Sequence, residues 1–159
     1  MSGVLYTATL ATALGCGLIA GVFFAFSTFV MPALKRLPPA QGIAAMQSIN
    51  KLAVTPAFMT ALFGTAVACL GLVAWAVISW GERPAALVLA GGALYLVGAI
   101  AVTTARNVPL NDGLATLHPQ GADAAGRWDE YVARWTAWNH VRVVASLAAA
   151  ATLTIVLHV

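Results

Sequence analysis

The sequence predicts an all-α fold: a four-helix transmembrane bundle with short peripheral helices in the first and third connections. Four stretches carry no Asp, Glu, Lys or Arg, and they cover residues 1–34, 52–81, 84–105 and 143–159. Because an apolar helix of about 20 residues crosses the bilayer core, each stretch can supply one span. The composition agrees, since 61% of the residues are hydrophobic and 8% are charged, against roughly 25% charged residues in soluble domains.

The expected spans lie within a single membrane domain that comprises residues 1–159. No basic residue precedes the first apolar run, and this run is too long for the core of a signal peptide, so we expect the first span to be retained. The spans are placed at about residues 5–31, 55–80, 85–105 and 138–158, and short helices are expected near 39–51 and near 121–137, the latter running into the fourth span.

Prolines and a turn mark the ends of these helices. Pro32 lacks the amide hydrogen that would continue the first helix, so it is expected to end that helix. Pro56 suits the first turn of the second helix. Residues 81–84 read Gly-Glu-Arg-Pro and predict a tight turn between the second and third spans.

Basic residues are distributed unevenly between the two ends of the spans. Seven of the eight lie on or beside the long connections, residues 32–54 and 106–137, and only Arg83 lies at the opposite end. Because cytoplasmic loops are enriched in Lys and Arg, we expect both long connections in the cytoplasm and both termini on the other side of the membrane. The pI is about 9.2, but basic residues spread along membrane edges form no continuous face, so no nucleic-acid partner is expected.

Small residues predict where the helices approach each other closely. Four of them recur every four residues along the first span, which favours a packing seam inside the bundle over a dimer interface. A homo-oligomer is the alternative that this pattern leaves open. The first seam comprises Ala13, Gly17, Gly21 and Ala25, and similar seams are expected at Gly64 and Ala68 and at Gly91 and Gly98.

The two halves of the chain share a pattern. A helix is followed by a proline, a peripheral helix, an asparagine and a second helix, with Pro32 and Asn50 in the first half and Pro109 and Asn139 in the second. This order is typical of a parallel repeat about an axis along the membrane normal.

All four asparagines of the chain lie near span ends on the side of the long connections. They are Asn50, Asn107, Asn111 and Asn139. A buried amide without partners costs about 1–3 kcal/mol, so such groups tend to face each other or a bound molecule. The alternative is that they cap helices and bond to the proline turns.

A helical face that leads into the fourth span combines aromatic, amide and cationic side chains. Arg142 lies about one turn inside the span, where a charge needs a partner or water. Its candidate partners are Asp112, Asp129, Glu130, the asparagine amides or an anionic ligand. At helical spacing the face comprises Trp128, Tyr131, Trp135, Trp138, Asn139 and Arg142.

His140 is the histidine closest to this face. A histidine can exchange a proton near neutral pH, which makes His140 the candidate base, and a structural role is the alternative. Because consecutive helical residues differ by about 100°, His140 does not have to point the same way as Asn139. The sequence has no HExxH or CxxC motif, so no metal site is expected. Cys16 and Cys69 lie in different spans and are expected to be free buried thiols.

Five motifs stand out along the chain: GVFFAFS (21–27), VMPAL (30–34), MQSIN (46–50), NVPLN (107–111) and WTAWNHVR (135–142). Together they resemble the anthrone oxygenase-like family of small four-span membrane proteins, most of which are bacterial, so the resemblance implies a bacterial inner membrane. The resemblance covers essentially the whole chain, and its paired motifs NVPLN and WNHVR are its most specific part. Fungal members of this family are taken to oxidise an anthrone to an anthraquinone, which makes the resembling chain a candidate oxidoreductase.

The resemblance implies a reaction in which a deprotonated, electron-rich ring donates directly to dioxygen. This chemistry needs no cofactor in principle, and none is expected. The protein would supply an apolar aromatic slot, a base and donors that stabilise the enolate oxygen. In these roles we expect Trp135, Trp138, Phe23 and Phe26 as the slot, His140 as the base, Asn139, Asn107 and Arg142 as stabilisers of the anion, and Asn50 and Asn111 as further substrate contacts.

Two alternatives remain open at the level of the sequence. The same pocket could bind a lipid, a quinone or a hydrophobic anion without turnover, with Arg142 and the indoles holding the head group. The protein could also be a structural membrane subunit, in which the asparagines and Arg142 close on one another. A base that points into the cavity would favour catalysis.

Overall fold

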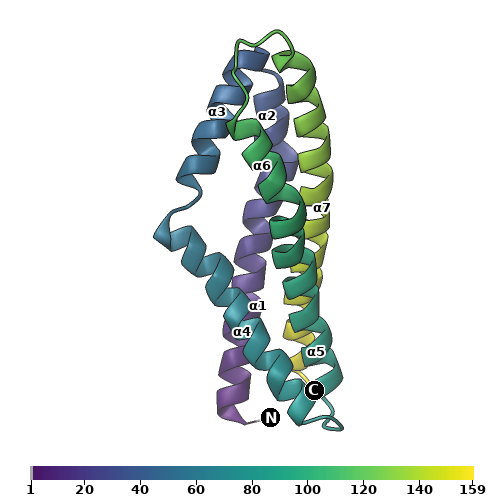
Figure 1. Ribbon diagram of the computed structural model, residues 1–159. Helices are drawn as coiled ribbons and strands as arrows, with labels where there is room; N and C mark the ends of the chain where they lie inside the picture. Colours follow the sequence, from purple (N-terminus) through teal and green to yellow (C-terminus); the bar gives the residue numbers. More distant parts are fainter. Residues whose placement is uncertain (1) are drawn as a thin grey trace.

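Four long helices run side by side and short helices extend the bundle at one end (Figure 1). The computed structural model describes residues 2–159. Its long helices, each long and apolar enough to cross a membrane, are Gly3–Lys35, Pro56–Ile78, Ala85–Ala115 and Ala124–Val156. The predicted fold class is confirmed, and the chain is a multi-pass membrane protein.

Two of the long helices, the first and the third, contain more than one element, because π-helical turns interrupt them and short helices continue beyond those turns. The elements in chain order are α1 (Gly3–Ala25), η1 (Phe26–Val30), α2 (Met31–Lys35), α3 (Pro39–Leu52), α4 (Pro56–Ile78), α5 (Ala85–Ala93), η2 (Leu94–Ala101), η3 (Thr103–Asn107), α6 (Val108–Ala115) and α7 (Ala124–Val156), where η denotes a π-helical turn.

The prediction that Pro32 ends the first helix is wrong. A proline ring clashes with the carbonyl four residues earlier and removes a hydrogen bond, but a π-helical turn accommodates it by bonding five residues back. The Met31 amide, just before Pro32, donates to the Phe26 carbonyl, and the helix continues to Lys35. The same device precedes Pro109, where the Val108 amide donates to the Thr103 carbonyl.

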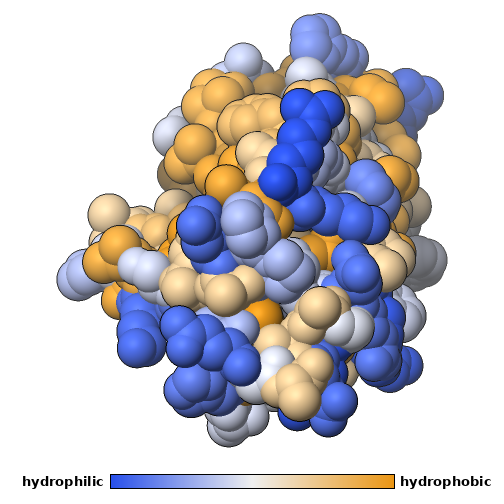
Figure 2. Space-filling model, turned by 90° about the horizontal axis from the view of Figure 1, so that it is seen from above, coloured by the Kyte–Doolittle hydropathy of each residue, from blue (hydrophilic) through white to orange (hydrophobic). Residues whose placement is uncertain are grey.

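The long connections lie at one end of the bundle, called the connection end below, which comprises α2, α3, α6 and the first turns of α7. The N- and C-termini both lie at the opposite end (Figure 1). The short link between α3 and α4 projects sideways about midway along the bundle (Figure 1), and α4 starts where the Thr55 hydroxyl accepts a hydrogen bond from the Phe58 amide. Seen from the connection end, hydrophilic and apolar side chains share the surface (Figure 2).

Two apolar clusters form the core. The larger one fills the space between the long helices and includes Ile19, Cys69, Val88, Tyr95 and Leu153. The smaller one holds the connection end together and includes Met31, Ile43, Met46, Trp128 and Trp135. The central cavity described below lies where these two clusters meet.

Glycines of the third long helix, not Gly17 and Gly21 of the first, allow neighbouring helices to approach closely. The prediction is confirmed at Gly91 and Gly98 of the third long helix: an added Cβ at Gly91 would lie 2.8 Å from Leu153, and one at Gly98 would overlap Ala145. It is wrong at Gly17 and Gly21, where nothing lies within 4 Å. A four-residue repeat drifts around a helix of 3.6 residues per turn, so the small residues leave the buried face of α1.

Candidate functional site

A cavity of about 230 Å³ lies where α3 meets all four long helices. We call it the central cavity. Its volume is below the roughly 300–1,000 Å³ of sites for drug-sized ligands, so the cavity suits a small molecule. Its walls are apolar and aromatic apart from Asn50, Thr103, Asn111 and Arg142. The lining residues are Val22, Phe23, Phe26, Met46, Ile49, Asn50, Ala53, Val54, Phe58, Met59, Leu62, Phe63, Thr103, Val108, Asn111, Trp135 and Arg142.

Arg142 of α7 is the one charged side chain in this lining, and only 5% of it is exposed. Its Nη2 donates to Asn139 Oδ1 at 2.6 Å, and its Nη1 donates to Thr103 Oγ1 at 3.2 Å. The Thr103 hydroxyl donates its own hydrogen to the Ala99 carbonyl, so its oxygen presents a lone pair to the guanidinium. Arg142 Nε is buried and has no hydrogen-bond partner among residues 2–159.

No carboxylate neutralises Arg142 within the part of the chain that the structure describes. The ion pair found there, Arg134 with Glu130, is on the surface. Of the partners expected for Arg142, the structure therefore selects an amide, Asn139, and none of the acidic side chains. A buried cation without a counter-ion is costly, and an anionic ligand would relieve that cost.

Aromatic rings surround the guanidinium. Its central carbon lies 4.2 Å from the centre of the Phe23 ring and 5.1 Å from that of Trp135. Both are cation–π distances. The Phe26 ring packs against Trp135 with 5.7 Å between the ring centres. The cation is thus placed beside flat apolar walls, which suits a planar ligand with a negatively charged oxygen at its edge.

Asn139 holds this arrangement in place from behind the cavity. It is fully buried, and its amide nitrogen donates to the Phe23 carbonyl and to Ser27 Oγ, each at 2.7 Å. Ser27 belongs to the π-helical turn η1, so the turn that accommodates Pro32 also supplies a partner for α7. Asn139 is therefore a positioning residue, which fixes the amide oxygen that Arg142 contacts.

A second polar group faces the cavity nearer the connection end. Asn111 Oδ1 accepts hydrogen bonds from the Tyr131 hydroxyl at 2.9 Å and from Trp135 Nε1 at 2.8 Å. Because its oxygen has two donors, the Asn111 amide nitrogen is the part with capacity for a ligand. Asn50 of α3 also lines the cavity. Since Trp135 and Arg142 are seven residues apart, the two polar levels are separated by about 10 Å along the α7 axis.

Most of the residues expected at the site lie in or against the central cavity. Phe23, Phe26, Asn50, Asn111, Trp135 and Arg142 line it, and Asn139 lies directly behind. Asn107 is buried beside it: its Nδ2 donates to the Trp135 carbonyl at 3.2 Å, while its Oδ1 has no partner among the described residues. The structure does not bring Trp138 into the cavity, because its ring lies under the Arg106 guanidinium at 4.8 Å.

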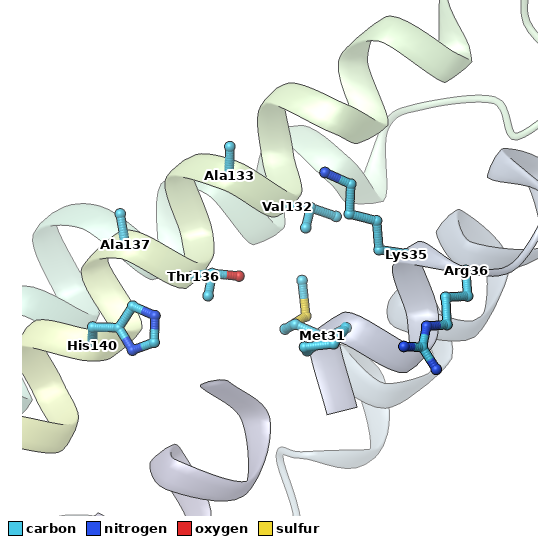
Figure 3. A pocket seen from close by; sticks show the side chains of 9 residues that line it. Met31, Lys35, Arg36, Val132, Ala133, Thr136, Ala137 and His140 are labelled. Atoms are coloured by element: carbon cyan, nitrogen blue, oxygen red, sulfur yellow. The ribbon is translucent and has the colours of Figure 1, made fainter. Parts of the chain in front are cut away.

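His140 does not lie in the central cavity either. It is exposed on the other side of α7, where it lines a separate hollow with Met31 and Thr136 (Figure 3). Residues two positions apart in a helix point in directions that differ by about 200°, so the side chains of His140 and Arg142 point to nearly opposite sides of α7. The expectation that His140 faces the ligand beside Arg142 is not met by this geometry.

Three further residues hold the site together: Thr103 and Ser27, which were not expected from the sequence, and Tyr131, which was expected on the same helical face but without a role. Thr103 and Ser27 bind the Arg142–Asn139 pair, and Tyr131 binds Asn111. The available signal was weak: a hydroxyl residue inside an apolar span usually bonds to its own helix, as Thr12 does to the Ala8 carbonyl. Within residues 2–159, no group of three or more His, Cys, Asp or Glu side chains could hold a metal ion.

A family model identifies the proteins to which this chain is related. The model of the anthrone oxygenase family matches residues 53–152, more than half of the chain. The chain belongs to the anthrone oxygenase family. The segment matched to anthrone oxygenases carries Asn111, Trp135, Asn139 and Arg142, whereas Phe23 and its wall of the cavity come from the preceding part. No curated protein and no solved structure matches the chain.

Proposed function

We propose that this protein oxidises a small, apolar aromatic ketone of the anthrone type with dioxygen, and that the central cavity holds the substrate as its enolate anion. The observation that carries this proposal is that Arg142 lines an aromatic cavity as a buried cation, and that its Nε has no hydrogen-bond partner among residues 2–159. Membership in the anthrone oxygenase family supports an oxygenase-like role in general.

The enolate oxygen would lie against the Arg142 guanidinium. A nearby positive charge favours the deprotonated form of an acidic ligand, most strongly where water is excluded. Deprotonation makes the ring system electron-rich and able to reduce dioxygen. Phe23 and Trp135, which already flank the guanidinium, would contact the two faces of the planar ring system.

The reaction balances without a further reductant. The substrate CH₂ group loses one proton, and the carbanion carbon transfers an electron to dioxygen and then forms a C–O bond with it. The resulting peroxide takes up a proton, loses its second C–H hydrogen as a proton and breaks its O–O bond. The carbon becomes a second ketone, and the distal oxygen leaves as water, so that one substrate and one O₂ give one quinone and one H₂O.

The cavity provides no conventional base to remove the first proton from the substrate. Its lining holds no His, Asp or Glu among the described residues. We assign proton removal to water, with Arg142 stabilising the anion that results. In this mechanism the catalytic contribution is electrostatic, and the expected magnitude is that of an oxyanion-hole donor.

The second polar level of the cavity fits a second oxygen on the substrate. The Asn111 amide nitrogen and Asn50 lie on the connection-end side, away from Arg142. A hydroxyl or carbonyl on the ring edge opposite the enolate oxygen could form a hydrogen bond with these amides. The proposed substrate is therefore an aromatic ketone with polar groups at two edges.

The test measures dioxygen consumption and quinone absorbance with purified protein in detergent, with anthrone as the probe and a protein-free sample to subtract spontaneous oxidation. Arg142→Gln should lower kcat/KM by about 100-fold or more. Arg106→Gln is the matched control, because Arg106 also lies over an indole but outside the cavity. Equal rates in both variants would rule out the proposed role of Arg142.

Binding without turnover is the second candidate function, and the lack of a base in the lining favours it. A hydrophobic anion or a quinone would then occupy the same cavity and depend on Arg142 in the same way. Equilibrium binding of a non-oxidisable analogue such as anthraquinone, measured in the same variants, separates the two functions. Binding that depends on Arg142 together with no protein-dependent dioxygen consumption would establish the carrier role.

A further inference from the structure

A second hollow, of about 640 Å³, lies on the outside of the bundle between α2 and α7. We call it the outer groove, and none of its residues lines the central cavity. We propose that the outer groove binds an acidic phospholipid, with the phosphate at its basic end and an acyl chain along its apolar floor. Its lining comprises Met31, Pro32, Lys35, Arg36, Val132, Ala133, Thr136, Ala137 and His140.

The charges of the groove all have one sign. Its ionisable side chains are Lys35, Arg36 and His140, and no Asp or Glu of the described residues lines it. Lys35 and Arg36 are exposed, so their charges are available to a ligand. Lysine and arginine side chains next to a span attract anionic lipid head groups, and their donors match phosphate oxygens.

The position of these charges fits a lipid phosphate. Lys35 and Arg36 are the first charged residues after 34 uncharged ones, so they lie where the apolar part of the first long helix ends. Head-group phosphates occupy that boundary of a bilayer. Lys35 and Arg36 lie at one end of the groove and His140 at the other, with Met31 and Thr136 between them (Figure 3).

The floor of the groove is apolar, which distinguishes a lipid from a free anion. Met31 is fully buried beneath it, and Val132 is 6% exposed. Ala133 and Ala137 of α7 are exposed and small, so the wall on that side is low. A free phosphate would use only the basic end, whereas an acyl chain would also cover the apolar length of the groove.

The first test is native mass spectrometry of the protein released from nanodiscs that contain equal amounts of phosphatidylglycerol and phosphatidylcholine. The wild type should retain one phosphatidylglycerol in preference to phosphatidylcholine. The Lys35→Ser, Arg36→Ser double variant should lose that preference, with affinity falling roughly fivefold for each charge removed. The matched control is the Lys51→Ser, Arg127→Ser double variant, which removes the same charge from two exposed positions outside the groove.

A second test keeps every charge and fills the groove. Ala137→Phe should displace the lipid, while Ala151→Phe, an equal change at an exposed position of α7 outside the groove, should retain it. Glycerol phosphate should not compete with phosphatidylglycerol, because it lacks the acyl chain. Unchanged lipid retention in both the charge variant and Ala137→Phe would overturn the proposal, as would displacement by glycerol phosphate alone, which would indicate a free-phosphate site. Neither test depends on the function of the central cavity.

Discussion

The Asn139 side chain joins Arg142 to the first long helix: its amide oxygen accepts from the guanidinium at 2.6 Å, while its nitrogen donates to the Phe23 carbonyl and to Ser27. An amide is suited to this position because it offers an acceptor on one side and two donors on the other. These contacts fix which way the amide points. Arg142 is therefore oriented by a residue one turn away, which is itself oriented by the first helix.

Asn139→Ala should both destabilise the bundle and disorder Arg142. It removes one hydrogen bond each from the buried Phe23 carbonyl and Ser27 hydroxyl and leaves the guanidinium only its bond to Thr103, so the free energy of unfolding should fall by about 1–3 kcal/mol. Thermal unfolding in detergent measures this, and kcat should fall more than KM rises, because the cation stays in the cavity but loses its orientation. Thr104→Ala is the control, because Thr104 is exposed and bonds only to its own helix. A normal melting temperature and kcat in Asn139→Ala would contradict the positioning role.

The contact between Gly98 and Ala145 should behave as a coupled pair. Gly98→Ala places a methyl group on that of Ala145 and should cost about 1–3 kcal/mol of stability, as overpacking does. Adding Ala145→Gly should recover most of the loss, since the second change removes the overlapping methyl. Gly17→Ala should have little effect, because open space surrounds that position. Additive losses in the double variant would show that the two helices do not touch here.

Asn111 can be tested by separating its acceptor from its donor. Asn111→Leu leaves the buried Tyr131 hydroxyl and Trp135 Nε1 unpaired, which should lower stability by about 1–3 kcal/mol. Asn111→Asp keeps the acceptor and should preserve stability, but it replaces the amide donor and should raise the KM for a substrate that carries a second oxygen. Calorimetry and steady-state kinetics give the two readouts. If Asn111→Asp left KM unchanged, the amide nitrogen would have no part in binding.

His140→Ala tests whether an imidazole supplies the base. Because His140 lies outside the central cavity, the variant should keep the dependence of kcat/KM on pH that the wild type shows. With water as the proton acceptor, the rate should rise with pH until the substrate itself is deprotonated. The measurement is anthrone oxidation over a series of buffers, with the spontaneous rate subtracted. Loss of an inflection near neutral pH in His140→Ala would restore the imidazole as the base.

The helix content and part of the site could be predicted from local patterns. The spacing of Trp135, Asn139 and Arg142 places them on one face of any regular helix, and the structure keeps them together. Trp138 shows the limit of this reasoning, because it is at the edge of the same face and the neighbouring Arg106 decides where its ring lies. The continuation of the first helix past Pro32 could not be predicted from the sequence either, because it depends on a π-helical turn with no distinct sequence signal.

Local sequence patterns are sufficient to predict that this chain forms four apolar helices and that a cation lies inside the last of them. Those properties follow from side-chain transfer energies and from the helical period, which are local quantities. Helix packing, in contrast, brings Phe23 and Ser27 to Asn139, more than a hundred residues away in the chain. It also places Arg142 at a cavity and His140 on the outside of the bundle. These outcomes depend on how separate helices pack against each other, and each helix gains its partners only when the bundle assembles.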